Sequence, residues 1–202
     1  MLNLALICGG PSQERGISLN SARSVLDHVQ GPDVTIVPFY VDPHGGFHQL
    51  STAQLYSNTP SDFDFKLGQQ GQALTATAFI QALKACDLVF PAIHGTYGED
   101  GTLQALLEQH NIPFIGSPSQ TCQQMFSKPK ANQALAALGF ATAPCLVIHQ
   151  DSLATAAARL ATFFATHALS QAVVKPAAGG SSIGVKLVDS PAAALAQVQY
   201  LF

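Results

Sequence analysis

Strand-length apolar runs alternate with amphipathic helical patterns along the first half of the chain, and this alternation limits the fold more than any other sequence feature. Strands are expected at residues 2–8, 34–41, 88–93 and 113–115, and helices at residues 18–29, 76–85 and 103–110. Most of these strands are continuously apolar, which indicates burial on both faces. The pattern therefore predicts an α/β fold with a Rossmann-like parallel sheet covered by helices on both sides.

A different arrangement is expected after residue 118. Helices are predicted at residues 119–126, 129–138, 152–166 and 191–201, and strands at residues 145–148, 172–175 and 183–188. We therefore expect two domains, 1–118 and 119–202. The polar stretch 51–75 has poor periodicity and is expected to be loop with short pieces of helix.

Composition narrows the classes of function. The 202 residues carry a formal net charge of −3, and only 10% of them are charged. This balance argues against a nucleic-acid or anionic-membrane binder, which would carry clustered Lys and Arg. The four cysteines lack metal-ligand spacing and are expected to be buried free thiols. The short apolar N-terminus has no basic lead and no apolar run is long enough to cross a membrane, so we expect a cytoplasmic protein.

The glycine-rich run 175–184, Lys-Pro-Ala-Ala-Gly-Gly-Ser-Ser-Ile-Gly, carries the clearest chemistry. Glycines let a backbone approach phosphates closely, their amides supply donors, and Lys175 adds a cation. Ser181 and Ser182 add hydroxyl donors. The run joins two expected strands, whereas the dinucleotide and P-loop fingerprints join a strand to a helix. The alternative interpretation is an ordinary hairpin turn with a surface lysine.

Two further loops follow expected strands at their carboxyl ends, where parallel sheets place their sites. Residues 9–15, Gly-Gly-Pro-Ser-Gln-Glu-Arg, follow the first strand, and residues 94–101, His-Gly-Thr-Tyr-Gly-Glu-Asp-Gly, follow the third. We expect these two loops to meet in space. Glu14 is suited to pair with an ammonium group of a ligand, or else with a nearby basic residue of the chain.

Four other polar side chains have two interpretations each. His94 is either a ligand contact or a hydrogen-bonded core histidine. Glu99 and Asp100 precede a helix and are suited to its N-terminus as well as to a ligand. Lys128 suits a phosphate group or a solvated helix start.

Together these segments resemble the D-alanine–D-alanine ligases of the ATP-grasp superfamily. Residues 9–21 resemble the family's opening motif, and residues 94–104 with 112–117 resemble its second. Lys128 and residues 175–184 resemble the third and fourth, in the same order along the chain. The resemblance implies a pre-ATP-grasp substrate-binding domain over residues 1–118 and the first part of an ATP-grasp domain over residues 119–202.

The resemblance also implies a reaction in peptidoglycan precursor synthesis. The family uses ATP and Mg²⁺ to phosphorylate the carboxylate of one D-alanine, and the amine of a second D-alanine attacks the acylphosphate. The resemblance implies that Glu14 receives the ammonium group of the first D-alanine in a network with Ser181, the two being the catalytic residues. The substrate would be bound by Glu14, His94, Glu99, Ser181 and Ser182, and ATP by Lys128, Lys175, Gly180, Ser181 and Ser182. A homodimer is implied as well.

Family chains continue well past the position of Phe202. The family's metal ligands, adenine-contacting segment and tyrosine loop match nothing in these residues, so no metal ligand is assigned and we expect the 202 residues alone to be inactive. Gly16 and Gly179 stand where the family commonly carries Glu. Two alternatives stay open: another ATP-grasp carboxylate–amine ligase with a different amino or hydroxy acid, and a non-catalytic binding or dimerisation module.

Overall fold

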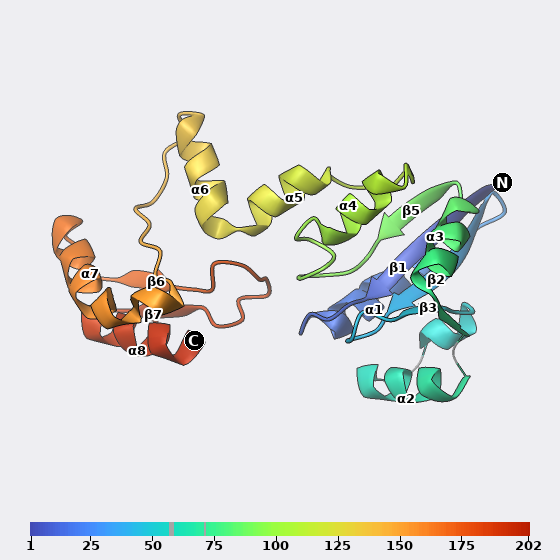
Figure 1. Cartoon of the computed structure of the whole chain (residues 1–202), viewed down its shortest axis with the longest axis horizontal. Coiled ribbons are helices and arrows are strands. Elements are labelled where there is room, and N and C mark those ends of the chain that lie inside the picture. The colour runs from blue at the N-terminus through green and yellow to red at the C-terminus, as the bar shows by residue number, and fades with distance from the viewer. Residues whose placement is uncertain (57–58, 71) are drawn as a thin grey trace. The chain divides into compact units, whose positions relative to one another are not determined.

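The computed structural model describes residues 1–56, 59–70 and 72–202, with the side chains of 68–70 left out. The chain divides into two compact units, Met1–Gln124 and Met125–Phe202, which are called unit 1 and unit 2 below (Figure 1). The domain boundary expected between residues 118 and 119 stays a prediction.

Unit 1 is built on a five-stranded sheet with the strand order β4-β3-β2-β1-β5. Its strands are β1 (Leu2–Gly9), β2 (Val34–Val41), β3 (Phe47–Gln49), β4 (Gln72–Leu74) and β5 (Leu88–Pro91). The central strand β1 pairs in parallel with β2 and with β5, as the apolar runs predict. The strands β3 and β4 extend the sheet in antiparallel orientation. The α/β class is therefore confirmed, and the sheet is mixed rather than wholly parallel.

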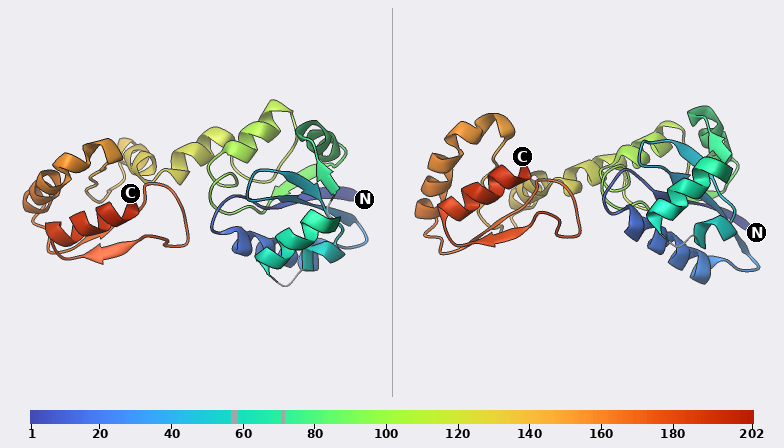
Figure 2. Two further views of the ribbon diagram at one scale, coloured as in Figure 1. Left: turned by 60° about the horizontal axis from the view of Figure 1, so that its bottom comes forward. Right: turned by 90° about the horizontal axis from the view of Figure 1, so that it is seen from below.

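Helices cover both faces of this sheet (Figures 1 and 2). They are α1 (Arg15–Val29), the 3₁₀ helix η1 (Ala53–Tyr56), α2 (Pro60–Gln70), α3 (Ala76–Lys84) and α4 (Thr102–Gln109). The next helix, α5 (Ser119–Phe126), has no buried residue and contains the boundary between the two units. Successive strand residues point to opposite cores. Leu6 and Tyr40 pack with α1, η1 and α2, whereas Ile7 and Phe39 pack with α3 and α4. This burial on two faces explains the continuously apolar strands.

The stretch 51–75 contains more regular structure than its sequence indicates. It forms η1, the 11-residue helix α2 and strand β4, and its residues 57, 58 and 71 lie outside the described residues. Tertiary contact compensates for the weak local pattern. The ring of Phe63 lies 4.7 Å from the ring of Tyr40, and Phe63 and Leu67 are both buried in the core under α1.

Unit 2 consists of helices packed on a two-stranded antiparallel hairpin. Its elements are α6 (Lys128–Ala137), η2 (Gln150–Ser152), α7 (Leu153–Thr166), β6 (Ala172–Val174), β7 (Lys186–Val188) and α8 (Pro191–Leu201). A small core joins α7 and α8 to one face of the hairpin. The loop between β6 and β7 is the glycine-rich run, so its predicted strand-to-strand setting is confirmed.

Three expectations need correction. Residues 145–148 form no strand, because the described part of unit 2 gives them no strand partner; the carbonyl of Val147 accepts from Arg159 Nη2 instead. Residues 113–115 form only a single parallel bridge, between Phe114 and Val89. The cysteines are all free, but only Cys8 is buried, and Cys145 is exposed. Across the described residues, every helix is too short or too polar to cross a membrane.

Candidate functional site

The two predicted loops of unit 1 meet at Gly95. Gly95 has a φ of +72°, and a Cβ at this position would collide with Ser12 Oγ and lie 2.7 Å from Glu14 Oε2. The loop after β1 and the loop after β5 are therefore in contact through a position that only glycine fits. The expectation that these loops come together is confirmed.

Glu14 lies at the start of α1 with 7% of its surface exposed. Its backbone amide donates to Ser12 Oγ over 3.0 Å, and the carbonyl of Ser12 accepts from the amide of Arg15. The side chain of Glu14 extends from this turn to Gly95. A carboxylate this buried has to be stabilised by hydrogen bonds or by a cationic group.

Ser18 joins the two strand ends that carry the loops. It is fully buried, accepts from the amide of Gly9 over 2.9 Å and donates to the carbonyl of Ala92 over 2.7 Å. Ser18 belongs to the run 9–21, but the sequence alone indicates no partners for its hydroxyl. Its position among the buried residues Leu19 and Ala22 of α1 was the available signal, because a hydroxyl on an apolar helix face requires partners.

His94 and Glu99 lie on the same loop beside this contact. His94 Nε2 is 2.9 Å from Ser21 Oγ on α1, and its Nδ1 is 3.9 Å from Glu99 Oε1. The other oxygen of Glu99 accepts from the amide of Gly95 over 3.0 Å. His94 is thus hydrogen-bonded and partly exposed rather than a core residue. The structure brings Glu14, Gly95, His94 and Glu99 into one part of unit 1.

The rest of this loop is held by its own side chains. Asp100 accepts from the amides of Tyr97 and Thr102, so it serves the start of α4 as predicted. Tyr97 has a left-handed φ of +77°, and burial together with the charge of Asp100 raises the pKa of its hydroxyl to about 12. The buried side chain of Gln104 donates to the carbonyl of Gly98 over 2.6 Å, a contact that the sequence does not predict.

In unit 2 the glycine-rich loop exposes backbone groups in unusual conformations. Gly179, Ser181, Ser182 and Gly184 all have φ between +51° and +109°, so the loop is not an ordinary two-residue hairpin turn. Such left-handed turns can point successive amides at an anion. Lys175, Ser181 and Ser182 are exposed at this loop.

Lys128 lies against the same loop. Its amide donates to the carbonyl of Ala177, and its Nζ donates to the carbonyl of Gly179 over 2.6 Å. The N-terminus of α6 and the glycine-rich loop are therefore tethered at one end of unit 2. The structure brings together the Lys128 and Gly180 regions that the sequence predicts as phosphate contacts, within unit 2. Glu14 and Ser181 belong to different units, and their shared network stays a prediction.

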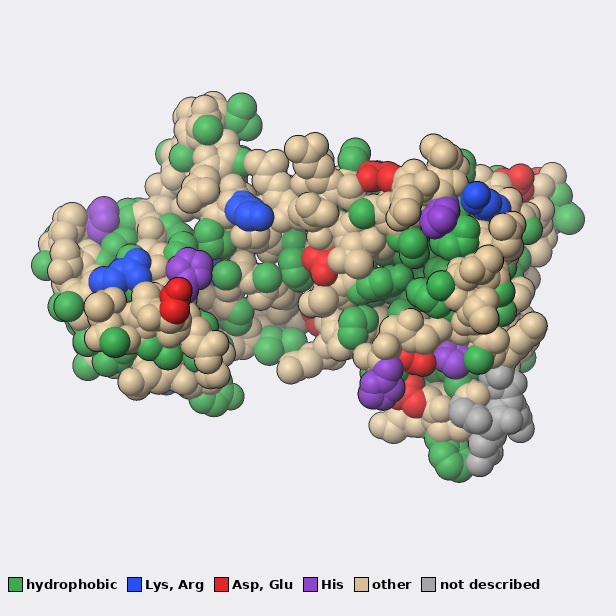
Figure 3. Space-filling model, viewed as in Figure 1, with side chains coloured by type: hydrophobic (Ala, Val, Ile, Leu, Met, Phe, Trp, Pro, Cys, Tyr) green, Lys and Arg blue, Asp and Glu red, His purple; other side chains and the backbone are tan. Residues whose placement is uncertain are grey.

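The charges on the described surface are sparse. On the face in Figure 3, Lys and Arg side chains lie in small separate spots. Among the residues that the structure describes, no group of three or more His, Cys, Asp or Glu side chains has the geometry of a metal site.

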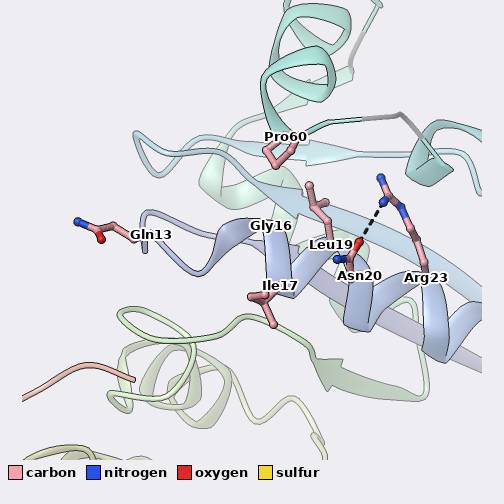
Figure 4. Close-up of a pocket in the computed structure, with 7 residues that line it drawn as sticks. All are labelled: Gln13, Gly16, Ile17, Leu19, Asn20, Arg23 and Pro60. Atoms are coloured by element: carbon pink, nitrogen blue, oxygen red, sulfur yellow. Dashed lines mark hydrogen bonds between the residues drawn. The ribbon is translucent and has the colours of Figure 1, made fainter. Parts of the chain in front are cut away.

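A surface pocket of about 330 Å³ lies between α1 and the start of α2 (Figure 4). It is lined by Gln13, Gly16, Ile17, Leu19, Asn20, Arg23 and Pro60. None of the predicted site residues of unit 1 lines it, so it lies outside the Glu14 site. Gln13, at one end, connects it to the loop after β1.

Comparison with known proteins identifies relatives of this arrangement. A family model described as the N-terminus of D-Ala–D-Ala ligases matches residues 3–117. The D-alanine–D-alanine ligase A of Chromobacterium violaceum is 31% identical over 202 residues, which cover 95% of this chain and 54% of the relative. The ligase A of Escherichia coli K12 is 28% identical, with 94% and 54% covered. The chain spans about half the length of the curated relatives it matches.

Solved structures share the fold. The D-alanine–D-alanine ligase of Coxiella burnetii superposes with a TM-score of 0.81 at 24% identity, over all of this chain and 60% of that one. The VanG D-Ala:D-Ser ligase of Enterococcus faecalis gives a TM-score of 0.78 at 22% identity, over 98% of this chain and 58% of that one. At sequence identities of 24% and 22%, the likeness establishes the fold alone. Any chemical role has to be argued from the residues of this chain.

Proposed function

This chain belongs to the family of D-alanine–D-alanine ligase N-terminal regions, and we propose that it forms the substrate-binding and phosphate-covering part of an ATP-dependent D-alanine–D-alanine ligase. The proposal covers the role in peptidoglycan precursor synthesis that such a ligase would have. The name of the Chromobacterium violaceum relative supports this activity. A cytoplasmic homodimer belongs to the same proposal and rests on the family resemblance.

The observation that carries the proposal is the buried Glu14 carboxylate beside the main chain of Gly95. The ammonium group of an amino acid offers three donors and a full positive charge to such a carboxylate. His94 and Glu99, on the loop that contains Gly95, supply further polar atoms at its edge. This arrangement favours an amino acid over an uncharged or purely anionic ligand.

The glycine-rich loop of unit 2 supports the ATP part of the proposal. ATP with Mg²⁺, when bound, supplies the phosphoryl group that activates the substrate carboxylate. Lys128, Lys175 and the amides around Gly180, Ser181 and Ser182 would hold phosphate oxygens, because fixed cations and amides stabilise the charge that a phosphoryl transfer moves. The family resemblance implies that the Mg²⁺ ligands belong to the part of the relatives that this chain does not cover.

A binding experiment on the chain tests the proposal. D-alanine is titrated into ¹⁵N-labelled protein, and the amide signals of Glu14, Gly95 and Glu99 are followed. We expect these signals to shift with D-alanine and not with N-acetyl-D-alanine, which lacks the ammonium group. Glu14→Gln should abolish the response, and Ser24→Ala, an exposed substitution on the same helix, should preserve it. Equal responses in wild type and Glu14→Gln would contradict the assignment of Glu14.

A further inference from the structure

The turn that carries Glu14 is held from outside the site by three side chains, Arg15, Tyr40 and Asp64, which we call the Arg15 clasp. Arg15 Nη1 lies 2.6 Å from Asp64 Oδ2 and donates to the hydroxyl of Tyr40 over 3.4 Å. The Tyr40 hydroxyl donates to Asp64 Oδ1 over 2.6 Å. Each member therefore contacts both of the others.

The clasp is anchored in rigid parts of unit 1. Tyr40 is fully buried on β2, and its ring packs on Phe63, the neighbour of Asp64 on α2. Burial and the hydrogen bond to Asp64 raise the pKa of the Tyr40 hydroxyl, so it stays protonated and keeps its donor. The side chains of Arg15 and Asp64 are only 18% and 33% exposed, which limits the screening of their ion pair by solvent.

The clasp reaches both ends of the loop that bears Glu14. At the first end, Gly9 lies against the Tyr40 ring so closely that a Cβ at Gly9 would collide with it. At the other end, Arg15 is the first residue of α1 and follows Glu14 directly. Tyr40 and the ion pair therefore contact the residues that flank the loop 10–14 on both sides.

The approach of α2 to α1 completes the geometry. Pro60, the first residue of α2, faces Gly16, where an added Cβ would come to 3.4 Å of the proline ring (Figure 4). Asp64 lies one turn along α2 from Pro60, and its carboxylate contacts Arg15 from this position.

We propose that Tyr40 and Asp64 are positioning residues for ligand binding by Glu14, acting through Arg15. This rests on the proposed function, in which Glu14 receives an ammonium group. The Arg15 cation stands one residue from the Glu14 carboxylate, and Asp64 holds it on the α2 side. Without Asp64, Arg15 loses its carboxylate partner and competes with the ligand's ammonium group for Glu14.

The test uses the 202-residue chain with the substitutions Asp64→Asn, Tyr40→Phe and Asp64→Glu. Asp62→Asn is the matched control, because Asp62 lies on the same helix and pairs with Lys66 at the surface. Amide hydrogen exchange is measured for the loop 10–15 and for β1, and D-alanine affinity is measured by titration. The two readouts separate a local loosening of the loop from a general loss of stability.

We expect Asp64→Asn and Tyr40→Phe to accelerate exchange in the loop roughly tenfold, the usual weight of one partly buried charged hydrogen bond, and β1 to change far less. The dissociation constant for D-alanine should rise by a similar factor, roughly tenfold, in both variants. Asp64→Glu should restore part of both effects, and Asp62→Asn should change neither.

Equal acceleration in the loop and in β1, or a loop unchanged in both Asp64→Asn and Tyr40→Phe, would overturn the proposal. If the loop loosens and D-alanine affinity stays at the wild-type value, the positioning role is also overturned. If wild type itself fails to bind D-alanine, the proposed function fails, and the exchange pattern alone then decides whether the clasp holds the loop.

Discussion

Replacing Ser18 with alanine should destabilise unit 1 more than any single surface change. The hydroxyl of Ser18 is fully buried and makes two hydrogen bonds, with the amide of Gly9 and with the carbonyl of Ala92. Alanine leaves that donor and that acceptor buried without a partner, each at a cost of about 1–3 kcal/mol. The expected loss in the free energy of unfolding is therefore roughly 2–5 kcal/mol, allowing for partial relaxation.

Native-state hydrogen exchange of the β1 amides measures this loss within unit 1, because their exchange requires large openings of the sheet. Ser24→Ala, an exposed position on the same helix, is the control and should change the free energy by less than about 0.5 kcal/mol. A Ser18→Ala variant within about 0.5 kcal/mol of wild type would refute the reasoning, since the two strand ends would then need no bridge.

Three further predictions concern single positions. Gly95→Ala forces a side chain into the space of Ser12 Oγ and Glu14 Oε2, and we expect D-alanine-induced NMR shifts to disappear while β1 exchange stays near wild type. The second prediction concerns the pKa of the Asp42 carboxyl. Burial alone would raise this pKa, but hydrogen bonds from His48, Gly46 and His44 lower it below the ordinary value. Its stabilisation is therefore complete above the ordinary Asp pKa and lost as pH falls through the lowered one, so the acid limb of a stability–pH curve should weaken in Asp42→Asn. Gly184→Ala should lower the melting temperature of unit 2, because its Cβ would lie 2.7 Å from Leu201 Cδ2 at a φ of +73°; an unchanged melting temperature would contradict this packing.

The sequence predicts the parts of the fold that are coded locally. The continuous apolar runs of β1, β2 and β5 predict buried parallel strands, and the pairing confirms them. The three-residue strands β3 and β4 are too short for a pattern of their own, and they form through pairing with β2 and with each other. Residues 145–148 have the apolar pattern of a strand and yet form none. A strand also needs a neighbouring strand to pair with, and the local pattern does not show whether one is present.

Some features of the candidate site could be predicted from the sequence, and others could not. The meeting of the Glu14 and Gly95 loops was predictable, because the carboxyl ends of adjacent parallel strands meet at one edge. The residues of other elements that hold these loops in place could not be predicted from the sequence. Asp64 lies in a stretch with no helical periodicity strong enough to predict α2, and its distance to Arg15 exists only after the sheet has formed. Contacts over 49 positions of sequence separation leave no local signal.

We propose that residues 1–202 supply the amino-acid and phosphate contacts of a ligase. The most direct measurement is formation of D-alanyl-D-alanine from ATP and D-alanine by this chain fused to the downstream half of the Chromobacterium violaceum relative, which the chain does not cover. We predict product from the fusion, none from the chain alone, and none from the fusion carrying Glu14→Gln. Product from the Glu14→Gln fusion at the wild-type rate, or no product from a fusion that folds and binds ATP, would contradict the account.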